Sequence, residues 1–492
     1  MNILVLDIGT TSMRGVLFDP KGQIKDVVSV STPLLIDKRE NHIEQDPHVY
    51  LESTAKICRA LSEKYAIDAV SVTAFRSAPT MVERDGRALT NFIMWQDTRN
   101  SGICARLHDA NAEIYRRCGA SVNTVFTGTK LTWLRENRPN VYDGAYKAMI
   151  VPDYVIHFMT GEFVTDRTYG SRTLLMDIRS LEWDAEMCRM LNVDMEKLCP
   201  LCDQGSVAGH VNAAFAEISG LRAGIPVISA GGDQQCGALG LGIMDSSTIE
   251  VNSGTGSFVI SLMEEPCLDN PNVICNVAAI PGKYTQEMNI IASAASLNWL
   301  IREFFPEYWG EKPNFAAINR IAAQTPPGAN GLISVPHFQG CGSRSWNPEA
   351  RAGFWGFSLG TRREDLIRAL YEGIACEISK SIDVLPEVCR RANTIAVAGG
   401  MSGSDVYNQI LCDFTGRRLT RSENIQATAV GAYVSAAVCS GLYSDYADAL
   451  AAARSGDTRK VFKPNAENMC LYRSIQSRSE SLYRTASREG ER

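Results

Sequence analysis

Asp233 is a single carboxylate between two glycine-rich segments, and this grouping suits phosphoryl transfer. Gly231 and Gly232 come directly before it, and a glycine lets a ligand approach the backbone because it carries no Cβ. The segment Asn252-Ser-Gly-Thr-Gly-Ser257 follows, in which glycines alternate with hydroxyl residues. Such a turn can present N–H groups and hydroxyls to an anion. The sequence therefore predicts a phosphoryl-transfer centre within residues 228–258, with Asp233 aimed at the substrate.

Asp233 has a second interpretation from the same residues. A helix through Gln234, Gln235 and Ala238 would begin at this carboxylate, and an aspartate at a helix start often serves only as an N-cap. The next segment is flanked by β-rich runs at 249–251 and 258–261, which predict a hairpin with the Gly-Thr-Gly turn at its tip. Residue types alone leave both roles of Asp233 open.

The N-terminus has a similar arrangement. Residues 3–19 comprise an apolar strand, a Gly-Thr-Thr-Ser turn and a second strand, with Asp7 at the end of the first strand. Its recurrence at 249–261 predicts two related halves, each opening with a phosphate-facing hairpin; chance similarity of two Gly-Thr turns is the alternative. We expect a boundary near 242–248, which divides the chain into domains 1–246 and 247–492.

Composition excludes several classes of protein. A chain of 492 residues predicts two or more domains, and a net charge of −6 argues against a nucleic-acid partner. Fifteen cysteines, an odd number, fit the reduced thiols of a cytoplasm, and the CxxC pair Cys199 and Cys202 lacks the second pair that a zinc site would need. Without a basic leader or a membrane-spanning apolar stretch, we expect a cytoplasmic protein with a small-molecule partner and no membrane contact. A homodimer is compatible with the sequence.

A second polar cluster suggests a sugar site. Residues 69–75 predict a strand that ends at Arg76-Ser-Ala-Pro79, and the apolar run from Asn91 ends at Trp95-Gln-Asp-Thr-Arg99. Loops after strands are where α/β proteins usually bind ligands. An indole can stack on a sugar while Gln96 and Asp97 bond its hydroxyls. The alternative is a buried Trp95 beside a surface ion pair of Asp97 and Arg99.

A glycine-rich turn near the C-terminus could receive a nucleotide. Residues 394–404 predict a strand feeding the turn with Gly399 and Gly400, and a helix follows through Val406 and Ile410, whose N-terminus favours an anion. The turn is not GxGxxG, so a dinucleotide site is not supported. Glycines needed only for packing remain the alternative.

Taken together, these residues resemble the FGGY family of carbohydrate kinases over nearly the whole chain. The order and spacing of the motifs carry the resemblance. They are Asp7-Ile-Gly-Thr-Thr11, Glu44-Gln-Asp-Pro47, Lys130-Leu-Thr-Trp133, Gly231-Gly-Asp-Gln-Gln235, Ser253-Gly-Thr-Gly256, Gly328-Ala-Asn-Gly331 and Ala398-Gly-Gly-Met-Ser-Gly403. The resemblance implies an α/β fold of two ribonuclease-H-like domains, of the actin-like ATPase type, around a central cleft.

The same resemblance implies an ATP-dependent kinase that phosphorylates a primary hydroxyl of a small sugar or polyol, with Asp233 as the catalytic base. Asp7 would hold Mg²⁺. The implied acceptor-binding residues are Arg76, Ser77, Trp95, Gln96, Asp97, Asp233 and Gln234. The implied ATP-binding residues are Thr10, Thr11, Gly254, Thr255, Gly256, Gly399, Gly400 and Asn408.

The residues expected around the acceptor depart from the pattern of each subfamily. Trp95 to Arg99 is similar to glycerol kinases and Arg76 matches their glycerol-contacting arginine, but Ser77 stands where they carry Glu and Val125 where they carry Tyr. Xylulokinases carry Gln-Met-His-Gly around 76–79, which also differs. With the small Ser77 and Ala78, we favour a ketose such as xylulose. A glycerol kinase-like polyol kinase is the alternative, and an actin-like ATPase or sugar sensor is the rival from another class.

Overall fold

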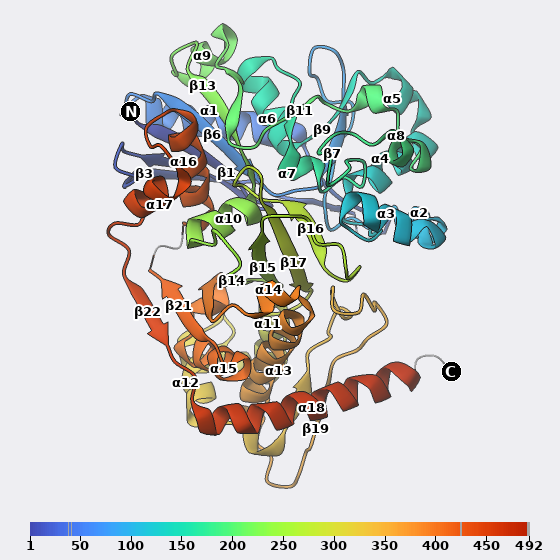
Figure 1. Cartoon of the computed structure of the whole chain (residues 1–492), viewed down its shortest axis with the longest axis vertical. Coiled ribbons are helices and arrows are strands. Elements are labelled where there is room, and N and C mark those ends of the chain that lie inside the picture. The colour runs from blue at the N-terminus through green and yellow to red at the C-terminus, as the bar shows by residue number, and fades with distance from the viewer. Residues whose placement is uncertain (38, 41, 424–425, 490–492) are drawn as a thin grey trace.

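The computed structural model describes residues 1–37, 39–40, 42–423 and 426–489 and shows two large sheets flanked by helices (Figure 1). The first sheet has the order β12-β13-β6-β1-β2-β3. Its strands are β1 (Ile3–Ile8), β2 (Ser12–Phe18), β3 (Ile24–Ser31), β6 (Ala69–Ala74), β12 (Ser206–His210) and β13 (Pro226–Gly232). All six residues of β1 are buried and all except Asp7 are aliphatic, as expected of a central strand covered on both faces.

The second sheet has the order β16-β17-β15-β14-β20-β21-β22. Its strands are β14 (Thr248–Ser253), β15 (Ser257–Met263), β16 (Ile274–Val277), β17 (Tyr284–Ile290), β20 (Thr394–Ala398), β21 (Arg418–Ser422) and β22 (Arg459–Phe462). All of these strands follow residue 247, and all strands of the first sheet precede residue 246.

The two sheets repeat one topology. In the first, β1 pairs antiparallel with β2 and parallel with β6, and β6 pairs parallel with β13. In the second, β14 pairs antiparallel with β15 and parallel with β20, and β20 pairs parallel with β21. The hairpins predicted at 3–19 and 249–261 are therefore confirmed, and they occupy equivalent positions.

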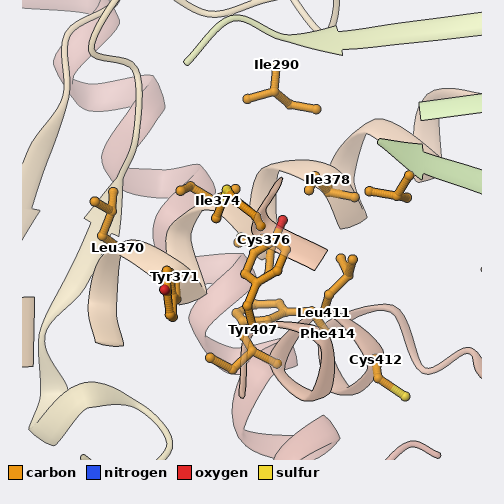
Figure 2. Packing of buried hydrophobic residues seen from close by; sticks show 14 of the residues in the cluster. Ile290, Leu370, Tyr371, Ile374, Cys376, Ile378, Tyr407, Leu411, Cys412 and Phe414 are labelled. Atoms are coloured by element: carbon orange, nitrogen blue, oxygen red, sulfur yellow. The ribbon is translucent and has the colours of Figure 1, made fainter. Parts of the chain in front are cut away.

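Helices cover the sheets on both sides. On the first sheet these include α1 (Pro47–Ser62), which begins after the N-cap Asp46 as its Asp-Pro pair predicts, α6 (Val151–Thr160) and α9 (Ala213–Ser219). In the second half, α13 (Arg363–Val384) and α15 (Asp405–Thr415) contact the sheet, α11 (Ala294–Phe304) and α12 (Phe315–Gln324) pack on α13, and α18 (Ala466–Glu489) packs on α13 and α15. Figure 2 shows Leu370 and Ile374 of α13 with Tyr407 and Leu411 of α15 in the core of this half.

Smaller elements complete the fold. The strands are β4 (Leu35–Asp37), β5 (His42–Gln45), β7 (Pro79–Val82), β8 (Phe92–Ile93), β9 (Lys147–Ile150), β10 (Thr165–Asp166), β11 (Leu201–Cys202), β18 (Ile333–Val335) and β19 (Gly353–Trp355). The helices are α2 (Ser101–Arg106), α3 (Asn111–Cys118), α4 (Thr127–Asn137), α5 (Pro139–Gly144), α7 (Arg167–Gly170), α8 (Ala185–Met190) and α14 (Glu387–Arg390).

A late part of the chain returns to the first sheet. Helix α16 (Ala427–Cys439) packs beside β1 and β6 and against α10 (Asp233–Leu241), and α17 (Tyr446–Ala453) packs on α16 (Figure 1). The backbones of α10 and α16 are in close contact, because a Cβ on Gly431 would lie 1.8 Å from the Cys236 carbonyl oxygen. Glycine is therefore required at this crossing.

Two expectations from composition can be compared with the structure. All fifteen cysteines are free thiols, as predicted for reduced cysteines. Among the described residues, no helix combines the length and apolar character needed to cross a membrane.

Candidate active site

The backbone before Asp233 turns sharply at the end of β13. Gly231 has a φ of +109°, which favours glycine, and Gly232 lacks room for a side chain, since a Cβ there would lie 2.9 Å from Arg76 Cδ. Tyr169 Oη and Thr73 Oγ1 both donate to the Gly231 carbonyl, at 2.9 and 2.8 Å. The two glycines thus let β13 pass directly into α10, with Asp233 as the first helical residue.

The Asp233 carboxylate is not engaged as an N-cap. The cap residue of α10 is Gly232, and within the part of the chain that the structure describes Asp233 Oδ1 accepts a hydrogen bond only from its neighbour Gln234 N, at 2.8 Å. Arg76 Nε lies 3.7 Å from Oδ1, and a quarter of the carboxylate side chain is exposed. Burial raises the pKa of Asp233, while Arg76 opposes the rise. A carboxylate of this kind can accept a proton more readily than an exposed one.

Arg76 belongs to a buried cluster of charges. Its Nη1 lies 2.9 Å from Oε2 of Glu287, and Nη1 of Arg172 lies 3.4 Å from Oε1 of the same carboxylate. The Arg172 guanidinium also lies over the Phe126 ring, 4.8 Å from its centroid. Burial and the neighbouring Arg76 lower the pKa of Arg172 to about 10. Both arginines and Glu287 are almost entirely buried, so these charges act in a poorly screened environment.

One loop from the first half contacts this cluster, and a second loop contacts the tip of the first hairpin. Ser77 follows Arg76 with a φ of +67° and donates from Oγ to the Arg172 carbonyl at 3.2 Å. Trp95 donates from Nε1 to Thr10 Oγ1 at 3.2 Å, so the loop carrying it touches the first hairpin tip. The structure thus brings Trp95 next to Thr10, and Arg76 next to Asp233.

The Asp97 carboxylate is bonded to neighbouring groups of the protein. Its carboxylate is fully buried and accepts from Arg99 Nε and Nη2, at 2.8 and 2.7 Å, and from Ile43 N at 2.7 Å. The Asp97–Arg99 pair that the sequence suggested at the surface is therefore buried. Its contacts hold the loop on which Trp95 and Gln96 are carried.

Some polar atoms around this region have no partner within the described residues. These are Oε1 of Gln96, Oε1 of Gln234 and Nε of Arg172, all inaccessible to solvent. A buried polar group without a hydrogen bond is costly. Hydroxyl groups of a small acceptor would supply both donors and acceptors to such atoms.

The first hairpin carries Asp7 close to Asp233. Asp7 is buried at the end of β1 and forms an ion pair with Arg14 on β2, which also donates to Gln426 Oε1 at 2.9 Å. Burial raises the pKa of Asp7 against the effect of Arg14, and the Asp7 charge contributes to raising the pKa of Asp233. Thr10 and Thr11 form the tip, where Thr11 is exposed. A carboxylate beside exposed hydroxyls fits Mg²⁺, which prefers oxygen ligands and keeps several waters.

The second hairpin tip is held by a helix N-terminus. The carbonyls of Gly254 and Thr255 accept from Ala294 N and Ser293 N at the start of α11, at 3.0 and 2.8 Å. A Cβ on Gly256 would lie 2.6 Å from the Ile290 carbonyl oxygen, so glycine is required there. Thr255 is exposed. These contacts turn two carbonyls of the tip toward α11 and leave the Thr255 side chain at the surface.

The glycine-rich turn after β20 packs directly on this hairpin. Gly399 has a φ of +82°, and a Cβ on it would lie 2.4 Å from the Ser253 carbonyl oxygen. A Cβ on Gly400 would meet no atom within 4 Å. Asn408 is buried, donates from Nδ2 to the Ser402 carbonyl at 2.7 Å, and has an unpartnered Oδ1. Gly399 therefore lies against Ser253. Asn408 stabilises the turn that follows Gly399 through its bond to Ser402.

Four residues of this region were not predicted as site residues: Arg14, Lys130, Arg172 and Glu287. Lys130 is buried and donates to the carbonyls of Ser77, Met94 and Val125. A charged residue inside a helix or strand, such as Lys130 in α4 and Glu287 in β17, is a candidate for a buried and paired charge. Their partners, however, lie far away in sequence and cannot be read from it.

A separate cavity of about 370 Å³ lies on the other side of the Trp95 to Arg99 loop, where Glu44, Asn91, Arg99 and Trp133 line it. None of its lining residues belongs to the cluster around Asp233. The Asp233 site is therefore identified by its chemistry and not by cavity size.

The chain is similar to known proteins over nearly its whole length. The N-terminal domain of the FGGY family of carbohydrate kinases matches residues 2–240, and its C-terminal domain matches residues 250–440. A xylulose kinase of Staphylococcus epidermidis is 27% identical over 489 residues, covering 98% of this chain and 96% of the relative. A glycerol kinase of Thermococcus kodakarensis is 28% identical over 497 residues, with the same coverage.

A solved structure matches the whole molecule. The xylulose kinase of Rhodospirillum rubrum superposes with a TM-score of 0.92 at 25% identity, covering 100% of both chains. The expected fold class, an α/β pair of ribonuclease-H-like domains of the actin-like ATPase type, is thereby confirmed. From its matched domains and its fold, the chain belongs to the FGGY family of carbohydrate kinases.

Proposed function

We propose that this kinase transfers the γ-phosphoryl group of ATP to a primary hydroxyl of a ketose such as xylulose. The observation that carries the proposal is the Asp233 carboxylate, which lies at the start of α10, a quarter exposed and 3.7 Å from the buried Arg76 guanidinium. We place the reaction in the cytoplasm, where ATP and small sugars are available.

In the proposed reaction, Asp233 orients the acceptor hydroxyl and takes its proton. The hydroxyl oxygen forms a bond to the γ-phosphorus as the bond to the β,γ-bridging oxygen breaks, and ADP leaves. Catalysis of such a transfer depends mainly on positioning and on neutralising charge. Because burial raises the pKa of Asp233, activity should fall as the pH is lowered through that raised pKa.

The hairpin tips would hold the phosphates. Thr10, Thr11, Gly254, Thr255 and Gly256 would supply hydroxyls and N–H groups, with Arg14 as a further positive charge. Mg²⁺, held by the phosphates and by Asp7 through water, would neutralise phosphate charge. Direct ligation by Asp7 is disfavoured because Arg14 already pairs with it. Gly399, Gly400 and Asn408 would receive the nucleoside.

The acceptor would lie between Arg76, Ser77, Trp95, Gln96 and Gln234, with Asp97 holding the loop. The preference for a ketose rests on the small Ser77 and on the xylulose kinases among the relatives. A glycerol-type polyol is the second candidate, supported by Arg76 beside Asp233 and by the glycerol kinases among the relatives.

A screen of ADP release with xylulose, other ketopentoses, glycerol, tetritols and aldonates tests the proposal. We expect kcat/KM to be highest for a ketopentose. Asp233→Ala should retain no more than a few per cent of the activity while binding ATP normally, because only the base is lost. Asp245→Asn, a change at an exposed aspartate in the next turn, is the control. ATP turnover that does not depend on any acceptor would support the ATPase rival and overturn the proposal.

A further inference from the structure

Glu287 connects the second half of the chain to the acceptor site. We propose that it is a positioning residue: its carboxylate, carried by β17, holds Arg76 in place beside Asp233 and links the acceptor site to the phosphate hairpin. This inference rests on the proposed function, since it assigns a role within the same site.

The hydrogen bonds and ion pairs of the Glu287 side chain indicate a positioning role. Its two oxygens lie 2.9 and 3.3 Å from Nη1 and Nη2 of Arg76, which is a two-pronged arrangement. Asn276 Nδ2 adds a contact at 3.4 Å, as does Arg172 Nη1. The carboxylate is 1% exposed, so it has no route to solvent. A bidentate pair fixes the plane of a guanidinium as well as its position.

Fixing that plane determines where the remaining nitrogen of Arg76 lies. With both Nη atoms on Glu287, Nε is the nitrogen that approaches Asp233 Oδ1, at 3.7 Å. This spacing is longer than a direct hydrogen bond. If the guanidinium were free to rotate, it could pair fully with Asp233. Such a pair would stabilise the ionised carboxylate, weaken it as a base and compete with the acceptor hydroxyl.

Two buried arginines need a negative charge beside them, and Glu287 provides it. Arg76 and Arg172 are both buried, and each lies in contact with this one carboxylate. Strand β14, separated from β17 by β15, carries Glu250, whose buried carboxylate oxygens have no hydrogen-bond partner among the described residues. Burial and the neighbouring Glu287 raise the pKa of Glu250 to about 8. At neutral pH Glu250 is therefore largely protonated, and Glu287 supplies the negative charge between the arginines.

The strand that carries Glu287 also supports the phosphate hairpin. Ile290, three positions further along β17, places its carbonyl oxygen 2.6 Å from where a Cβ on Gly256 would be. One strand therefore contacts the arginine of the acceptor site and the glycine of the phosphate site. The Gly256 contact is made by the backbone of β17 and the Arg76 contact by the Glu287 side chain, so a side-chain change at Glu287 should affect the acceptor site and leave the phosphate site in place.

Variants of Glu287 test this role through steady-state kinetics and nucleotide binding. Glu287→Gln keeps the side-chain volume and removes the charge. Glu287→Asp keeps the charge but shortens the side chain by one methylene, which moves the carboxylate away from Arg76. We expect Glu287→Gln to raise the acceptor KM or lower kcat at least tenfold and to leave the dissociation constant for a non-hydrolysable ATP analogue within twofold. Glu287→Asp should fall between this variant and the wild type.

Glu264→Gln is the matched control, because Glu264 pairs with Lys283 at the surface. A wild-type acceptor KM and kcat in Glu287→Gln would overturn the positioning role, as would equal losses for acceptor and nucleotide. If Glu287→Gln does not fold, Glu287→Asp decides the matter, and wild-type kinetics in that variant would overturn the role. Failure of the wild-type enzyme to phosphorylate any acceptor would instead overturn the proposed function.

Discussion

Lys130 is a buried cation whose ammonium group joins three separate segments. Its Nζ donates to the carbonyl of Ser77 at 2.9 Å, of Met94 at 2.8 Å and of Val125 at 3.3 Å. Burial lowers the pKa of Lys130 to about 7, and the Asp97 charge opposes this. The segments at Ser77 and Met94 carry or adjoin residues proposed above to bind the acceptor. The Lys130 side chain therefore sets the distance between these two segments.

Replacing Lys130 with methionine should therefore disturb the acceptor site specifically. The change keeps the apolar stem but leaves three buried carbonyls without their donor, and each unmet group is costly. We expect the acceptor KM of Lys130→Met to rise tenfold or more, since small displacements of positioning groups cost much activity. The KM for ATP should change by less than twofold. Lys197→Met is the control, because Lys197 also donates to two carbonyls, those of Asp143 and Ala145. Equal effects of the two variants would contradict the prediction.

The C-terminal helix α18 is attached to α13 through a buried ion cluster. Glu377 of α13 lies 3.0 Å from both Lys380 and Arg344, and Arg344 also pairs with Glu480 of α18 at 3.1 Å. His337 and Cys341 lie within 4.8 Å of the Glu377 carboxylate, in a grouping that could suit a metal ion. The two cations already on the carboxylate would repel a metal ion, so we interpret the cluster as an ion-pair network.

The charge of Glu377 should make stability depend on pH. Burial opposes its ionisation, but Lys380 and Arg344 outweigh burial and lower the pKa of Glu377 to about 2. The folded-state pKa thus lies below the ordinary value of 4.5, so the stabilisation is present above pH 4.5 and is lost as the pH falls toward 2. The shift corresponds to about 3 kcal/mol. We expect Glu377→Gln to be destabilised by about 3–5 kcal/mol at neutral pH, because two buried cations lose their partner.

Chemical denaturation of wild type and Glu377→Gln between pH 3 and pH 7 measures this effect. The difference in the free energy of unfolding should shrink as the pH is lowered. Glu387→Gln is the control, since Glu387 pairs with Arg391 only at the surface. A gap that stays constant over this pH range would show that the charge of Glu377 does not contribute.

At the scale of the whole molecule, the two sheets share a continuous apolar core. One cluster joins Ile3 and Ile228 of the first sheet, Ile260 and Ala396 of the second, and Val430 of α16. The crossing of α10 and α16 lies within it, with Gly240 and Gly431 permitting the close approach. Because α10 begins with Asp233, this crossing also supports the carboxylate that we propose as the base.

Adding a single methyl group at this crossing should affect both stability and activity. In Gly431→Ala the new Cβ would lie 1.8 Å from the Cys236 carbonyl oxygen, which forces the two helices apart. We expect a loss of about 1–3 kcal/mol in the free energy of unfolding, with a larger loss of kcat than of nucleotide affinity. Gly102→Ala on α2 is the control, because a Cβ there meets no atom within 4 Å. Equal stability of both variants would show that the crossing tolerates separation.

Much of the architecture and several motifs could be predicted from local pattern. The hairpins at 3–19 and 249–261, the helix after Asp46 and the helix that begins at Asp233 all appear as expected. Strand and helix periodicity and turn residues act over a few positions, which is why they can be read from the sequence. The surface ion pair suggested for Asp97 was placed wrongly, because a local pattern does not report depth.

By itself, then, the sequence determined the family, the repeated hairpins and the position of Asp233 at the start of a helix. Only the tertiary structure decided which charges meet. Arg76 pairs with Glu287 across 211 residues and Arg14 with Gln426 across 412. Lys130 gathers three segments that no motif connects. Such contacts depend on strand register and on the packing of helices against sheets, which are properties of the whole chain and leave no local signal.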